Sequence, residues 1–122
     1  MMDELVDALA AKAGIDRAVA EKAVGAILGF LRKEGPVDQV RALIEKIPGA
    51  ESAIAAAGST GGLASMLGGG VMALGAKLMG FGLGMNEIQS LGRELFRFGR
   101  DKIGADGMGT IIAETPGLSK FA

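Results

Sequence analysis

The sequence predicts an all-α, single-domain protein: a compact helical bundle of six or seven helices built from two pseudo-symmetric three-helix units. Two observations carry this prediction. Apolar residues recur at spacings of three and four, which is the period of an amphipathic helix, and no segment shows the alternation typical of a strand. In addition, the two ends of the chain align with each other when the sequence is shifted by 68 residues.

This internal repeat pairs residues 1–54 with the last part of the chain without a gap. Identity is low, but the matched residues occur in the same order in both copies. They are Gly14 with Gly82, Phe30 with Phe98, Arg32 with Arg100, Asp38 with Asp106, Ile44 with Ile112, and Pro48-Gly49 with Pro116-Gly117. Self-similarity of this kind indicates one structural unit used twice. Within one domain over 1–122, we therefore expect repeat units at 1–54 and 71–122 and a Gly-rich connector at 55–70.

The first unit begins with two helices. Residues 3–12 predict a short amphipathic helix with acidic residues in its first turn, where they stabilise the helix dipole. After a break at Gly14, a longer helix is expected over 17–34, with Asp16 as its N-cap and an end at Gly35. The inward face of this long helix is predicted from apolar spacing to contain Ala20, Ala23, Val24, Ile27, Leu28 and Leu31.

A third helix is expected over 39–46, with Asp38 as its N-cap and an end before Pro48, which lacks the amide hydrogen that a helix needs. Its counterpart in the second unit follows Asp106 and ends at Pro116-Gly117. Since the two aspartates occupy the same offset in both copies, a capping role explains them more simply than acid–base chemistry does.

The second unit repeats this plan. A helix near 71–80 is followed by a long amphipathic helix over 86–103, which Gly104 is expected to stop. Asn86 and Gln89 are spaced like a capping box at its start. The positions predicted to share one stripe of this helix are Ile88, Leu91, Leu95, Phe98 and Lys102. The large residues expected to include the main core positions of both long helices are Leu28, Phe30, Leu31, Leu95, Phe96 and Phe98.

The composition argues against catalysis and against nucleic-acid binding. The chain has 14 acidic and 13 basic residues, so it lacks the basic excess of nucleic-acid surfaces. It has no histidine and no cysteine, which removes the commonest general base, the thiol nucleophile and two metal ligands. Asp3, Glu4 and Asp7 stand where a secretory signal would carry positive charge, so we expect a cytoplasmic protein.

The middle of the chain is unusual because residues 52–76 carry no charge and are rich in glycine and methionine. We consider three interpretations: a buried central helix, a protein–protein seam, and a membrane-associated segment. The sequence does not decide whether 58–70 is helix or loop. If this region contacts a partner, the adaptable apolar side chains that would do so are Met66, Met72 and Met79.

Three arginines of the second unit share one helical face, since they are spaced i, i+4 and i+7. They are Arg93, Arg97 and Arg100. Local pairs of Arg97 with Glu94 and Asp101 favour a solvated face. The aligned residues of the first unit are Gly25, Gly29 and Arg32. The two units therefore differ on this helical face. In the first unit, the glycines predict close approach of another helix. Any charged partner is expected at the second unit.

One set of residues in the first unit has a recognisable pattern: Gly14-Ile15-Asp16, Ala20, Ala23-Val24, Leu28, Leu31 and Ile47-Pro48. Over residues 3–54 and, more faintly, 71–122, the chain thereby resembles bacterial helical domains of unknown function such as the VcgC/VcgE-like group. The second unit departs from this pattern, with Gly84 in place of Asp16 and Thr115 in place of Ile47. The resemblance implies tandem helical units and brings no activity or catalytic residues.

We therefore predict a non-enzymatic helical module for protein–protein interaction or self-association, with a second copy or another protein as its partner. The alternative is a peripheral membrane or lipid-binding protein that uses the uncharged segment 52–76. No catalytic, metal-binding or cofactor-binding residue, no cofactor and no small-molecule substrate is inferred. The candidate contact residues are Arg93, Arg97, Arg100, Met66, Met72 and Met79.

Overall fold

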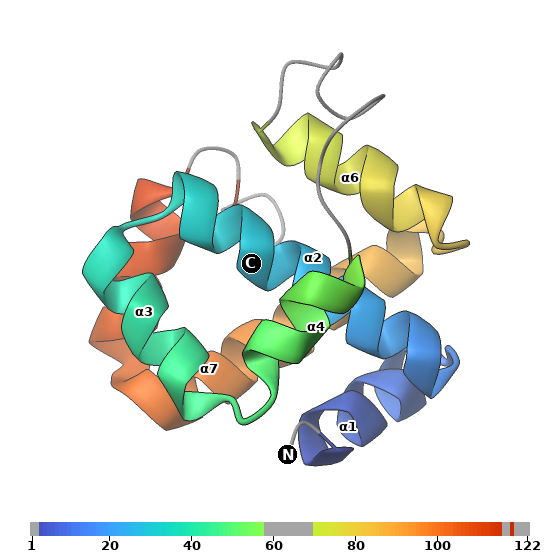
Figure 1. Cartoon of the computed structure of the whole chain (residues 1–122), viewed down its shortest axis with the longest axis horizontal. Coiled ribbons are helices and arrows are strands. Elements are labelled where there is room, and N and C mark those ends of the chain that lie inside the picture. Colours follow the sequence, from blue (N-terminus) through green and yellow to red (C-terminus); the bar gives the residue numbers. More distant parts are fainter. Residues whose placement is uncertain (1–2, 58–69, 116–117, 119–122) are drawn as a thin grey trace.

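A computed structural model describes residues 3–57, 70–115 and 118, and the elements within these ranges are six α-helices (Figure 1). They are α1 (Asp3–Ala13), α2 (Arg17–Glu34), α3 (Val37–Lys46), α4 (Ala50–Ala57), α6 (Gly70–Gly80) and α7 (Met85–Glu114). The described residues contain no strand. The all-α prediction is therefore confirmed, with six helices in this part of the chain.

The sequence analysis predicts five of these helices to within a few residues but not α4. Its residues, AESAIAAA, are mostly alanine and lack the large periodic apolar side chains that mark an amphipathic helix. Alanine has the highest helix propensity, and packing against α2 covers Ala50, Ala53 and Ala57. The expected connector at 55–70 thus begins inside α4 and ends inside α6, and 58–69 lies outside the described residues.

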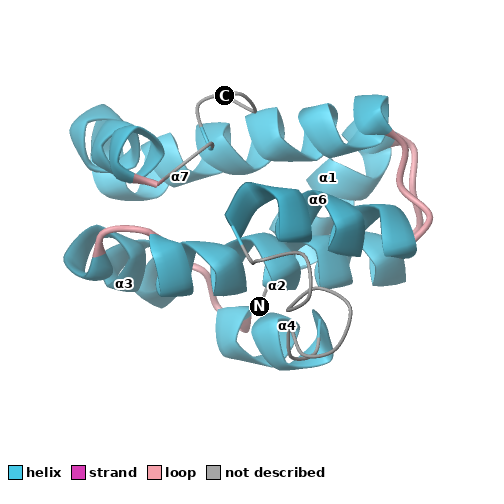
Figure 2. Ribbon diagram, turned by 90° about the horizontal axis from the view of Figure 1, so that it is seen from above, coloured by secondary structure: helices cyan, strands magenta, loops and turns pink. Residues whose placement is uncertain are grey.

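The central element is α2, which contacts each of the other five described helices. Its most extensive contact is with α4, and α4 and α7 lie on opposite sides of it (Figure 2). Because α2 is covered from several directions, its buried residues are not confined to one stripe. They are Ala20, Ala23, Val24, Gly25, Ala26, Ile27, Leu28, Phe30 and Leu31. All six predicted inward positions are among them.

Two glycine turns set the path from each short helix to the next long one. Gly14 has a φ of +70° and Gly82 a φ of +91°, a backbone region that glycine adopts without steric cost. The amide of Ile15 donates to the Ala10 carbonyl at 3.0 Å, and the amide of Leu83 donates to the Leu78 carbonyl at 3.4 Å. Both bonds span five residues, as in a Schellman motif, so α1 and α6 end in the same way.

The long helix α7 contains a kink at Gly104, where φ is +86° and ψ is 160°. This is the position at which the sequence analysis expects the helix to stop. The segment 85–103 therefore forms one straight run, and 105–114 forms a second. The kink turns the chain without a loop, because glycine tolerates the positive φ that other residues avoid.

The capping predictions need correction. Asp38 lies inside the first turn of α3, whose N-cap is Pro36, and Asp106 lies inside the helical segment that follows Gly104. The N-cap of α7 is Gly84 rather than Asn86, and the carboxylate of Glu87 accepts the Gly84 amide at 2.8 Å. Asp16 does occupy the N-cap position of α2, but its side chain makes no capping hydrogen bond. Pro36 and Gly84 thus occupy the N-cap positions of α3 and α7, and of the three aspartates predicted as caps only Asp16 stands at an N-cap.

The predicted close approach at Gly25 and Gly29 is made by α4. A Cβ atom on Gly25 would overlap the Ala53 carbonyl, so the two backbones are in direct contact there. A Cβ atom on Gly29 would lie 3.6 Å from Cγ2 of Ile54, an ordinary van der Waals distance. Beyond the glycines, Nη1 of Arg32 donates to Oε2 of Glu51 at 2.9 Å. This ion pair joins the two helices at the edge of their contact.

The matched pair Gly25→Ala and Gly29→Ala tests this contact. We expect Gly25→Ala to lower the free energy of unfolding by about 1–3 kcal/mol, because the new methyl group forces α4 away from α2. Gly29→Ala should instead be neutral or stabilise by up to about 1 kcal/mol, since alanine favours a helix and the site has room. Urea denaturation of both variants measures the difference. Equal effects at the two positions would contradict the backbone contact.

The core of α7 is centred on Phe96 rather than Phe98. Phe96 is 2% exposed, whereas Phe98 is only partly buried and has the Lys102 ammonium 5.1 Å from its ring centroid. Of the six large residues expected to form the core of the long helices, Phe98 is the only one that is not buried. The buried face of α7 includes Gly92 and Gly99 rather than Phe98. The spacing of apolar residues does not reveal this, because the two positions are glycine.

Phe96→Ala and Phe98→Ala should therefore differ in cost. We expect Phe96→Ala to lower the free energy of unfolding by about 3–5 kcal/mol, because it leaves a cavity inside the core. Phe98→Ala should cost only about 1–2 kcal/mol, since part of that ring already contacts water. Thermal or chemical denaturation followed by circular dichroism gives both values. A larger loss at Phe98 than at Phe96 would show that the core is centred elsewhere.

Candidate interaction surfaces

The largest described hollow is a groove of about 550 Å³ formed by α3, α4 and the C-terminal end of α2. Its volume lies within the range of about 300–1,000 Å³ that is usual for binding pockets. Val40 and Ile47 form its floor and are almost fully buried, and Ile44 is half-buried beside them. The groove is therefore an apolar trough between two helices.

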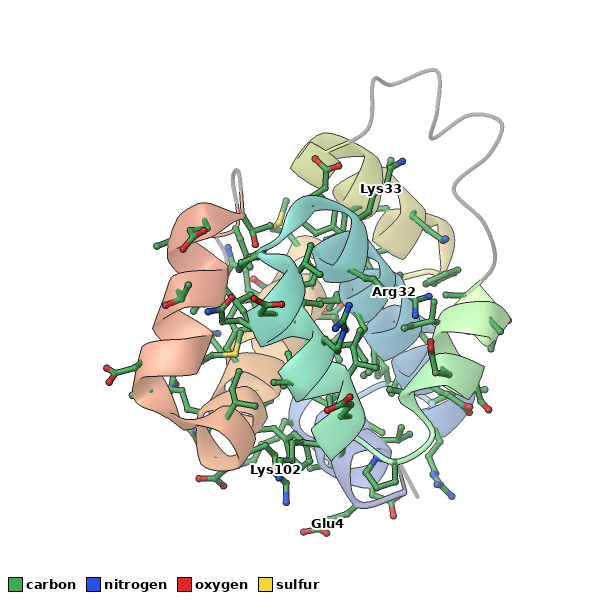
Figure 3. The ribbon with its side chains drawn as sticks, turned by 60° about the vertical axis from the view of Figure 1, so that its left-hand side comes forward. Glu4, Arg32, Lys33 and Lys102 are labelled. Carbon is green, nitrogen blue, oxygen red and sulfur yellow. The ribbon has the colours of Figure 1, made fainter. Side chains whose placement is uncertain are left out.

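Charged side chains line the edges of this α3–α4 groove. Arg32 pairs with Glu51 across α2 and α4, and Figure 3 shows Arg32 between α3 and α4. Arg41 and Glu45 stand on the α3 side, one turn apart and both exposed. The edge thus carries two positive and two negative groups around an apolar floor, which suits a protein surface better than a single small ion.

Val37 extends this apolar floor to the surface, since 63% of its side chain is exposed. Val37 is not among the residues predicted from the sequence, although its spacing from the other apolar residues of this segment indicates it. Val37, Val40, Ile44 and Ile47 are spaced by three and four residues, so they form one stripe along α3. The apolar stripe of α3 is therefore longer than the core requires, and its first residue lies at the groove.

A second hollow of about 240 Å³ lies on the other side of the Ile47-Pro48 turn. Its lining includes Lys46 from α3, Lys102 from α7 and Glu4 from α1. Figure 3 labels Glu4 and Lys102 at the same end of the molecule. The charges of opposite sign offset one another, and the ammonium group of Lys102 is already positioned over the Phe98 ring.

A third space, of about 20 Å³, lies between α2, α6 and α7. It has room for about one water molecule, but its lining offers no polar side chain to hold one. The lining residues are Ile27, Leu74, Gly75, Leu78, Ile88, Gly92, Phe96 and Leu118. This space is a packing gap in the core rather than a binding site.

The three arginines predicted on one face of α7 are all exposed. Arg97 lies 3.8 Å from the Glu94 carboxylate, which is the only ion pair this group makes in the part of the chain that the structure describes. The second predicted pair, of Arg97 with Asp101, does not form there. Arg93 and Arg100 therefore present their guanidinium groups to solvent.

The methionine predictions have mixed outcomes. Met79 is 51% exposed on α6, as a contact residue would be. Met66 lies outside the described residues, and the side chain of Met72 is not described either, although its backbone belongs to α6. Met85, at the start of α7, is also 51% exposed and was not predicted. The two exposed methionines flank the Gly82 turn between α6 and α7.

The titratable groups show little sign of a reactive centre. Burial lowers the pKa of Lys77, which is the one group for which a clear pKa shift is found among the described residues. In the same ranges, no three side chains of histidine, cysteine, aspartate or glutamate are grouped to hold a metal ion. No described helix combines the length and the apolar character needed to cross a bilayer.

Comparison with known proteins gives no match of any kind: no family model, no curated protein and no solved structure matches this chain.

Proposed function

We propose that this protein is a non-enzymatic helical module that binds protein surfaces, with a second copy of the chain as the first partner to test. The observation that carries the proposal is the α3–α4 groove, with its apolar floor and its exposed Val37. An apolar centre surrounded by charged residues is the usual anatomy of a protein interface. The absence of histidine and cysteine from the sequence favours binding over catalysis.

The proposal includes an architecture of two pseudo-symmetric three-helix units packed as one bundle. Three pairs of turn hydrogen bonds that recur at the offset of 68 residues support it. They are Ile15–Ala10 with Leu83–Leu78, Ala20–Asp16 with Ile88–Gly84, and Ala50–Ile47 with Leu118–Thr115. The packing is also reciprocal, because α1 contacts α7 more extensively than α2, and α6 contacts α2 more extensively than α7. The VcgC/VcgE-like resemblance implies the same tandem plan.

A protein partner is favoured over a lipid surface by the burial of three apolar residues that are described within the uncharged segment 52–76. Ala53 and Ala57 of α4 are buried against α2, and Leu74 of α6 is buried in the core. Apolar side chains that already pack inside the molecule are not available to enter a bilayer. Vesicle flotation tests this choice directly.

In that experiment, the full chain is floated with vesicles of neutral phosphatidylcholine and with vesicles that also contain an anionic lipid. We expect the protein to stay at the bottom of the gradient with both, because its described apolar side chains are largely covered. Flotation with either vesicle would favour the lipid-binding alternative. Binding to anionic vesicles alone, lost at high salt, would point to surface charge rather than insertion.

The variant Val37→Glu tests the groove as the interface. We expect wild-type protein to associate as its concentration rises, and Val37→Glu to weaken this association at least about tenfold by placing a charge at the apolar centre. Met85→Glu is the matched control, since it adds the same charge at another exposed apolar residue. Sedimentation velocity over a wide range of concentrations measures both. A strict monomer throughout, or equal effects of the two variants, would contradict self-association through this groove.

A further inference from the structure

The arginine face of α7 corresponds in the repeat to a face of α2 that another helix covers. Residues 85–103 of α7 lie 68 positions after residues 17–35, which contain α2. At this offset, Gly25 corresponds to Arg93, Gly29 to Arg97 and Arg32 to Arg100. The same face of the repeated long helix can therefore be compared in α2 and in α7.

On α2 this face binds a helix. Gly25 allows the α4 backbone to lie against the α2 backbone, Gly29 faces the Ile54 side chain, and Arg32 holds Glu51 of α4 by an ion pair. This is the most extensive contact between any two described helices. The face on α2 is thus a helix-binding surface, in which Arg32 pairs with the Glu51 carboxylate.

On α7 the same face is bare. The exposed stripe contains Asn86, Gln89, Arg93, Arg97 and Arg100, which lie within one side of the helix by their spacing. No described helix covers it. Arg100 stands where Arg32 stands on α2, but it has no carboxylate partner among the described residues. Within the described part of the chain, α7 thus keeps the arginine but has no helix over this face.

We infer that the arginine face of α7 binds an acidic helix of a different protein, at the place that α4 occupies on α2. This inference goes beyond the α3–α4 groove, and it rests on the two-unit architecture proposed above. Arginine side chains in place of Gly25 and Gly29 keep the partner helix further from the α7 backbone. Contact is then made by guanidinium–carboxylate pairs, which arginine forms in a bidentate geometry that lysine lacks.

The spacing specifies the partner's chemistry. Arginines at i, i+4 and i+7 match carboxylates at helical spacing on a facing helix. No helix of the described residues presents three acidic residues at i, i+3 or i+4, and i+7, and Asp7, Glu51 and Glu94 are already paired. The chain thus does not offer its own complement. The chain has 14 acidic and 13 basic residues and therefore lacks the basic excess of nucleic-acid surfaces, which disfavours nucleic acid as the partner.

The probe is a labelled alanine-based peptide of about 20 residues, long enough to be helical, with glutamates at alternating three- and four-residue spacing. Fluorescence anisotropy measures its binding to the full chain at low salt and at about 0.15 M salt. We expect saturable binding that weakens about 10-fold to 100-fold when Arg93, Arg97 and Arg100 are all changed to glutamate, since each exposed pair contributes modestly. Circular dichroism verifies that each variant is folded.

The matched control changes Lys12, Lys22 and Lys33 to glutamate, which alters net charge equally on exposed residues elsewhere. It should retain most of the binding. Two control peptides should bind weakly: one with glutamine for glutamate, and one of the same composition made non-helical by central prolines. Equal losses in both triple variants, equal binding of either control peptide, or no saturation up to about 1 mM would overturn the inference.

Two further experiments distinguish the acidic helix from other possible occupants of the arginine face. A single-stranded oligonucleotide that binds as tightly as the acidic peptide, with the same dependence on the three arginines, would replace the helix with nucleic acid. Self-association that is abolished by the arginine variant but not by Val37→Glu would make a second copy the occupant. Loss of self-association in Val37→Glu, with peptide binding intact, would leave the groove and the arginine face as independent surfaces.

Discussion

The backbone contact between α2 and α4 at Gly25 is the constraint on which the other features depend. It requires a residue without a side chain on α2, because the Ala53 carbonyl occupies the space that a Cβ atom would take. Once α4 lies there, Ala53 and Ala57 are covered without any large apolar side chain on α4. A helix made mostly of alanine is thereby included in the core through proximity rather than through side-chain bulk.

The same contact creates the α3–α4 groove. Gly49 has a φ of +84°, and the Ala50 amide donates to the Ile47 carbonyl at 3.1 Å, so the chain reverses within a few residues between α3 and α4. With α4 held against α2, α3 contacts α2, and the apolar stripe of α3 is only partly covered. The Arg32–Glu51 pair closes one side of that space. The groove is thus a consequence of where α4 is seated.

The proposed duplication explains how one scaffold can provide two different surfaces. Residues that fill the core keep their apolar character in both halves, as Ile27 and Leu95 or Leu43 and Ile111 do. The face of the long helix is under a different constraint. Where α4 covers it, glycine is required at position 25; where no described helix covers it, arginine is tolerated and its charge becomes available. In this proposal, divergence at two positions, Gly25/Arg93 and Gly29/Arg97, changes an internal contact into an external one.

The sequence by itself determined the helical class, most helix positions and much of the buried face of α2, because apolar spacing and glycine or proline breaks are local properties of the chain. It also indicated that Gly25 and Gly29 meet another helix. It could not determine that α4 is this helix, that Phe96 rather than Phe98 fills the core, or that Val37 opens onto a groove. These features depend on contacts between residues far apart in the chain. The packing of α2 against the five other described helices, and of α7 against α1 and α3, decides which face of each helix is covered and which remains exposed.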